Sequence, residues 1–136
     1  MRGVMVLLLL VTAACSPAPE RPAVPPSIAR YPVRLLAGAE FEGRLTLDGQ
    51  CLFLVSPDGT IYGTAWPANG TIWDAAGYQL IVGDMAAPVG ARIRLGAEIA
   101  ELDDDHADGF VVGPRPECRG DAFLFVQSFV SVDADD

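Results

Sequence analysis

The densest group of polar side chains lies in the stretch 101–109, which also holds the only histidine of the chain. Carboxylates are the hard oxygen ligands that Ca²⁺ takes, and a histidine can act as an acid or a base near neutral pH. The calcium-loop spacing fails, because a loop starting at Asp104 has His106 at its third position and Arg115 at its twelfth, where glutamate belongs. We therefore expect a solvated acidic loop, with weak divalent-cation binding or hydrolysis as alternatives. The residues that would carry either alternative are Asp103, Asp105, His106 and Asp108.

Two tryptophans are candidates for a ligand-binding face. Trp66 stands at the end of an expected strand, and Trp73 follows the turn signal Asn69–Gly70. Exposed aromatic rings on a β-sheet can stack on sugars or bases, whereas buried rings form ordinary core. We expect Phe53 and Tyr62 in the core, because both sit within strands, and keep the two tryptophans as the candidate ligand face.

No other pattern in the sequence indicates catalysis. It contains no glycine-rich phosphate loop, no recognisable Ser/His/Asp set and no paired Cys/His metal spacing. We therefore expect a protein that is not an enzyme and has no cofactor.

The chain begins with a segment typical of an exported protein. Arg2 precedes the apolar run 4–14, which is well short of the roughly 20 residues that span a bilayer. Small residues at 12–14 stand directly before Cys15 and resemble the lipobox of a bacterial lipoprotein signal peptide. The resemblance implies that residues 1–14 are removed and that Cys15 carries a diacylglyceryl thioether, usually with an acyl chain such as palmitate on its new amino group. In the alternative, an ordinary signal peptidase leaves Cys15 unmodified.

The cysteine count agrees with the lipoprotein resemblance. The chain has 3 cysteines, and an odd number in an exported protein needs an explanation. Lipidation of Cys15 would leave Cys51 and Cys118 as an even pair in an oxidising compartment. We therefore expect a structural disulfide between these two residues.

The charge of the chain indicates an acidic surface, and its proline content indicates an extended segment before the domain. The formal net charge is −9, and all 9 basic residues are arginine, so the chain lacks the positive surface that nucleic acids require. The same balance argues against a polybasic contact with anionic lipid, which leaves the lipid on Cys15 as the expected membrane contact. Residues 15–32 are rich in proline and should form an extended tether of up to roughly 50 Å, at about 3.1 Å per residue.

Residues 33–132 have the pattern of a single all-β domain, followed by an acidic tail at 133–136. Short apolar segments alternate with turn signals, and no convincing helical period is present. The turn signal at 56–59 predicts a hairpin over residues 51–65. We expect a small antiparallel Greek-key barrel of OB-like scale, with a β-sandwich as the alternative. The expected strands are 42–47, 51–55, 60–65, 71–74, 78–82, 92–95, 98–102 and 122–130.

A second resemblance covers most of residues 43–125. It is carried by Gly43-Arg-Leu-Thr-Leu, Gly49-Gln-Cys-Leu-Phe-Leu, Trp66-Pro67, Val89-Gly90 leading to Arg92-Ile-Arg-Leu-Gly96, and Cys118-Arg-Gly120. Together these resemble a β-barrel domain of small bacterial lipoproteins of unknown function. The chain departs from that pattern after residue 120, where aromatic residues are expected sooner than Phe123. The resemblance implies no activity.

The expected function is that of a lipid-anchored envelope protein. Its β domain would bind or support an envelope protein or a glycan without catalysing a reaction. In bacteria with two membranes, an aspartate after the lipidated cysteine typically keeps a lipoprotein at the inner membrane. Ser16 stands there instead, so we expect the outer membrane, with the domain on the periplasmic side, or the plasma membrane in a bacterium that has only one.

Overall fold

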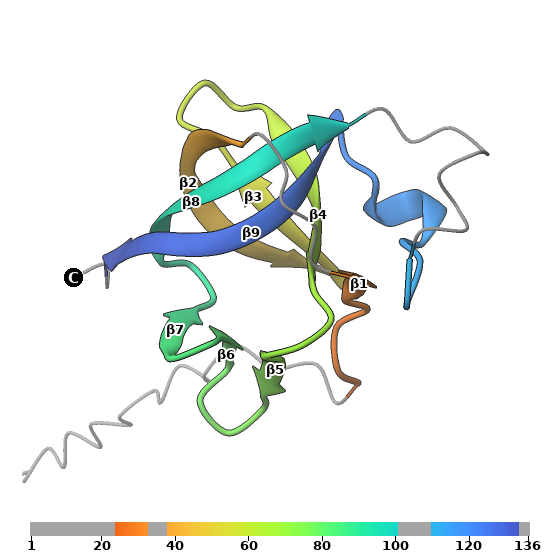
Figure 1. Ribbon diagram of the computed structural model, residues 1–136, viewed down its shortest axis with the longest axis vertical. Coiled ribbons are helices and arrows are strands. Elements are labelled where there is room, and N and C mark those ends of the chain that lie inside the picture. Colours follow the sequence, from red (N-terminus) through yellow and green to blue (C-terminus); the bar gives the residue numbers. More distant parts are fainter. Residues whose placement is uncertain (1–23, 33–37, 101–109, 134–136) are drawn as a thin grey trace, which may run out of the picture.

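The computed structural model describes residues 24–32, 38–100 and 110–133, and this part of the chain is all-β (Figure 1). None of the helical structure in these ranges is long and apolar enough to cross a membrane. One 3₁₀ turn, η2 (Pro116–Cys118), accompanies the strands. The strands are β1 (Ala29–Tyr31), β2 (Ala39–Asp48), β3 (Cys51–Val55), β4 (Ile61–Pro67), β5 (Thr71–Asp74), β6 (Gln79–Val82), β7 (Met85–Pro88), β8 (Arg92–Ala100) and β9 (Ala122–Asp133).

The strands form two sheets. A six-stranded mixed sheet has the order β1-β4-β3-β2-β8-β9, with an additional parallel pairing between β4 and β9. Five strands of this sheet each pair with two others of the same five, namely β2, β3, β4, β9 and β8. The remaining strands form a three-stranded antiparallel sheet, β5-β6-β7, which is inserted in the chain between β4 and β8 (Figure 1).

The main core lies on the inner faces of the long strands. In β8, Ile93 and Leu95 are fully buried while Arg92 and Arg94 are exposed, as the alternating sequence predicts. The arginines instead face Glu42 and Glu40 of β2 across the surface. The same core contains Leu45, Leu54, Trp66, Leu80, Leu124 and Val126.

The predicted hairpin over residues 51–65 is confirmed, since β3 and β4 pair antiparallel. Its turn closes with a hydrogen bond from Gly59 N to Ser56 O at 2.9 Å. Asp58 accepts hydrogen bonds from the Ser56 hydroxyl and from Thr60 N. These bonds, led by that of Ser56, lower the pKa of the Asp58 carboxyl to about 2.

Two expected strands, 92–95 and 98–102, are in fact one strand over the described residues, β8. Gly96 and Ala97 do not end the strand. The register against β9 shifts between them, and glycine inside a strand commonly marks such a bulge. Strand β7 was not expected, because Met85–Pro88 lacks branched and aromatic residues and ends in proline.

The expected tether boundary at residue 32 is wrong. Ser27 N donates to Gln50 O at 2.7 Å, and β1 pairs in parallel with β4. Ile28, Ala29 and Tyr31 are buried, so they belong to the folded domain and not to a solvated linker. Proline-rich sequence masked this strand, since the prolines flank its three residues without interrupting them.

A second, smaller cluster covers the outer face of β9. Phe123 and Phe125 point away from the main core and meet Phe110, whose ring stacks on Phe125 at a centroid distance of 5.4 Å. Tyr31 contacts Phe125 edge-on, and its hydroxyl donates to Val126 O at 2.5 Å. The cluster ties β1 and the chain around residue 110 to the six-stranded sheet.

Burial, with a smaller contribution from Glu98, raises the pKa of Tyr31 from 10.0 to about 12. A raised pKa in the folded state means that the neutral phenol stabilises the fold fully below pH 10 and loses this effect as the pH rises through about 12. We expect the free energy of unfolding to fall by roughly 2 to 3 kcal/mol across this window. Urea denaturation at several pH values tests this, with Tyr31→Phe as the comparison. The same alkaline loss in both proteins would show that Tyr31 is not its source.

Candidate functional site

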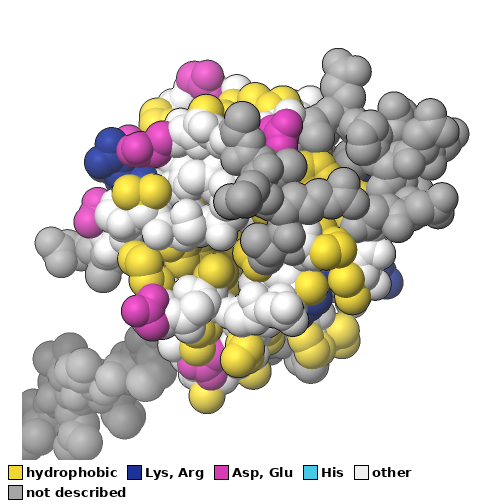
Figure 2. Space-filling view, in the orientation of Figure 1, with side chains coloured by type: hydrophobic (Ala, Val, Ile, Leu, Met, Phe, Trp, Pro, Cys, Tyr) yellow, Lys and Arg dark blue, Asp and Glu magenta, His cyan; other side chains and the backbone are white. Residues whose placement is uncertain are grey.

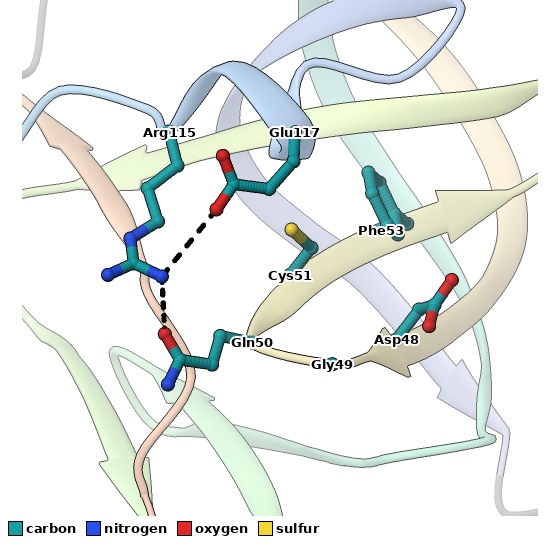
Figure 3. Close-up of a pocket in the computed structure, with 7 residues that line it drawn as sticks. All are labelled: Asp48, Gly49, Gln50, Cys51, Phe53, Arg115 and Glu117. Carbon is teal, nitrogen blue, oxygen red and sulfur yellow. Dashed lines mark hydrogen bonds and ion pairs between the residues drawn. The ribbon is translucent and has the colours of Figure 1, made fainter.

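A pocket of about 370 Å³ lies where the β2–β3 turn, β3 and η2 meet (Figure 3). The end of β2 contributes Asp48, and the turn contributes Gly49, whose positive φ of 59° favours glycine, and Gln50. The other lining residues are Cys51 and Phe53 of β3 and, across the opening, Arg115 and Glu117. Segments more than 60 residues apart in the sequence therefore form one site.

The expected disulfide between Cys51 and Cys118 is present, and Cys51 lines this pocket. The S–S distance is 2.02 Å, and the Cα atoms lie 5.1 Å apart. Both residues are buried with Phe53 in a small cluster of their own. Because Cys51 lines the pocket and Cys118 directly follows Glu117, the disulfide holds one wall of the pocket against the other.

Close backbone packing fixes the same wall against β4. A Cβ atom on Gly63 would come within 2.4 Å of Arg119 O and 2.5 Å of Cys118 O, so only glycine fits there. Just after η2, Asp121 N donates to Ile61 O at 2.7 Å, and Ile61 N donates to the Asp121 carboxylate at 3.1 Å. The segment that carries Arg115 and Glu117 is thus fixed by these contacts to β4 just after η2, as well as by the disulfide.

Polar groups gather at the mouth of the pocket. Arg115 Nη1 donates to Gln50 Oε1 at 2.5 Å and lies 3.6 Å from Glu117 Oε1 (Figure 3). With Asp48, the lining carries two carboxylates and one guanidinium, so its formal charge is negative. These groups can exchange hydrogen bonds with a neutral or cationic polar ligand, whereas a phosphate would face repulsion from the carboxylates. Cys51, which lines the pocket, offers no free thiolate, because its sulfur is bonded to that of Cys118.

The sequence predicted a ligand face at Trp66 and Trp73, and this prediction is wrong for Trp66, which is buried. Its ring is 1% exposed and packs edge-on against Phe129. The indole Nε1 donates to the buried Thr64 hydroxyl at 2.9 Å, and this partner allows the whole side chain to enter the core. Trp73 is half-buried, packs against the main core and meets the ring of Tyr78 at 5.7 Å.

The other expected site residues lie outside the described residues. These are Cys15 and the acidic-loop candidates Asp103, Asp105, His106 and Asp108. Within the ranges 24–32, 38–100 and 110–133, no group of three or more His, Cys, Asp or Glu side chains is arranged to hold a metal ion.

The pocket itself was not expected from the sequence. Arg115 and Glu117 are ordinary charged residues near prolines, and Gln50 was noted only as part of the stretch 49–54 that carries the second resemblance, not as a site residue. A signal was nevertheless present, because pairing Cys51 with Cys118 brings residue 117 next to residue 50. The expected disulfide could therefore have indicated a site at this junction.

Comparisons with known proteins add no relatives. No protein-family model matches the chain, and neither a curated protein nor a solved structure matches it. The two resemblances described for residues 1–15 and 43–125 therefore depend on their sequence motifs alone.

Proposed function

We propose that this chain is a lipid-anchored protein of the bacterial envelope whose β domain binds another envelope component without catalysing a reaction. The anchor part of the proposal is supported by the positively charged start, the short apolar run and the small residues before Cys15. The binding part is carried by one observation, the polar pocket between the β2–β3 turn and η2.

The finer architecture in this proposal is a closed Greek-key barrel of the OB type. In its support, the pairings run from β2 through β3, β4, β9 and β8 and return to β2. Numbered by their order in the chain, the five strands then follow 1-2-3-5-4-1, with the third and fifth strands parallel. The β-sandwich alternative is less well supported, because the parallel pairing of β4 with β9 joins what would otherwise be the two ends of an open sheet.

The barrel assignment agrees with the position of the pocket. OB barrels bind oligonucleotides and oligosaccharides on the face of their second and third strands, between the loops that follow the first and the fourth strand. Here these loops are the β2–β3 turn and the connection from β8 to β9, which contains η2. The pocket of the described structure is lined by residues of both.

The chemistry of the pocket favours a polar, uncharged or positively charged partner. Two carboxylates, an amide and a guanidinium can share hydrogen bonds with sugar hydroxyls or with a peptide backbone. The chain's net charge of −9 opposes nucleic acids. The proposed partner is accordingly an envelope glycan or an envelope protein. The proposed location is the periplasmic face of the outer membrane, following Ser16, or the plasma membrane in a bacterium with one membrane.

The anchor is tested by metabolic labelling with a fatty-acid analogue in cells producing the full chain. We expect label on the wild-type protein and none on Cys15→Ser, which should remain as the uncut precursor or become soluble. Ser16→Ala is the matched control and should keep the label. Equal labelling of Cys15→Ser and wild type would refute the anchor. Density-gradient fractionation of the labelled protein then tests the membrane, since sedimentation with inner-membrane markers would contradict the outer-membrane assignment.

A further inference from the structure

An exposed apolar pair, Val111 and Val112, lies beside β1. The side chains are 63% and 44% exposed, although valine is among the residue types most often buried. Their backbone is held in place by Arg30, whose N donates to Val112 O at 2.8 Å and whose O accepts from Val111 N at 2.8 Å. The fold therefore presents this valine pair to solvent on an ordered segment and does not bury it.

The valine pair lies close to the point where the tether joins the domain. Val24, itself 54% exposed, stands six positions before Arg30, so the described chain begins within about 20 Å of Arg30, which lies beside the pair. In Figure 1, this start and β1 are on the side of the molecule opposite the C-terminal end of β9. Hydrophobic side chains are visible on that same side in Figure 2. Arg30 stands fifteen positions after Cys15, so a membrane that holds Cys15 is within reach of the valine pair, at roughly 3.1 Å per residue.

The charges around the valine pair differ from those of the whole chain. The segment 110–119 contains Arg115 and Arg119 against one acidic residue, Glu117, and Arg30 lies next to the pair in β1. The chain as a whole has a net charge of −9. In the segment 110–119 and in β1, three arginines therefore stand against one carboxylate, which favours contact with an anionic lipid surface, whereas the acidic stretch 101–109 precedes the pair in the sequence.

We propose that Val111 and Val112 insert shallowly into the surface of the same bilayer that holds the lipid on Cys15. This inference rests on the proposed anchor. Two valines bury too little apolar area to bind a membrane alone, but a short tether keeps them at an effective concentration in the millimolar range. The weak contact then orients the domain. Because Ser27 N bonds to Gln50 O, the pocket beside it would open near the lipid headgroups, where a membrane-bound partner could be met.

Fluorescence quenching by brominated lipids tests this orientation in the full lipidated chain, reconstituted in phosphatidylethanolamine–phosphatidylglycerol vesicles. Val111→Trp introduces the probe, and Val112→Trp is a second variant in case the first folds poorly. Val130→Trp is the matched control, since Val130 is 52% exposed and lies towards the far end of β9. Native Trp66 and Trp73 contribute equally to every variant and are subtracted.

We expect the probe at position 111 or 112 to be quenched at least twofold more than the probe at position 130. Equal quenching at these positions, in protein that floats with the vesicles, would overturn the orientation and leave the anchor intact. Protein that does not float with the vesicles would overturn the anchor and this inference together.

Discussion

Replacing Cys51 and Cys118 together with alanine should lower the free energy of unfolding by about 4 kcal/mol. The disulfide spans 67 residues, and closing a loop of that length restricts the unfolded chain by about this amount. Urea denaturation of the wild type and the double variant measures the change. The transition of the variant should move to a lower urea concentration.

The loss should also be visible locally. Without the disulfide, η2 keeps its backbone contacts to β4 but loses its covalent link to β3, so amide hydrogens near Cys118 should exchange faster with solvent. Amides in β6 provide the internal control, because that strand belongs to the other sheet. An unchanged denaturation midpoint, or exchange that rises equally in both places, would contradict the role assigned to the disulfide.

Trp66→Ala should lower the free energy of unfolding by about 3 to 5 kcal/mol, the usual cost of removing a large buried aromatic ring. The ring fills the centre of the core against Phe129. Its removal also takes a hydrogen bond from the Thr64 hydroxyl, although that group still donates to Leu52 O at 2.8 Å. Thermal and urea denaturation both measure the effect.

Trp73→Ala is the matched control for this variant. Trp73 is only partly buried at the edge of the core, so its removal should cost less. A Trp66→Ala protein as stable as the wild type would mean that Trp66 is not a core residue. Equal losses from both variants would mean that the two rings are buried to a similar extent, contrary to the structure.

The sequence predicted correctly those elements that depend mainly on residues close together in the chain. The 51–65 hairpin follows from a turn signal between two apolar runs, and the burial of Ile93 and Leu95 follows from strict alternation. By contrast, β1 depends on a partner far along the chain, since its residues pair with Ala65–Pro67. Gly96 could be interpreted as an end or as a bulge, and only the partner strand β9 decides between them.

The candidate site was predictable in one part only. Counting cysteines identified the disulfide, because two internal cysteines in an oxidising compartment are expected to form one. Trp66 was placed wrongly, since the sequence cannot show that Thr64 would satisfy its indole N–H inside the core. Gln50, Arg115 and Glu117 were not expected as site residues, because their contacts depend on distances across the fold and not on their spacing in the chain. Only the expected disulfide indicated that residues 50 and 117 would lie close together.

Site-specific photo-crosslinking in intact cells tests the binding proposal most directly. A photoreactive residue replaces Glu117, whose side chain is 61% exposed at the mouth of the pocket. The control replaces Asp84, which is exposed in the turn between β6 and β7. We expect a light-dependent adduct from position 117, identified by mass spectrometry as an envelope glycan or protein, and none from position 84. No adduct from position 117, or the same adducts from both positions, would contradict a binding site in this pocket.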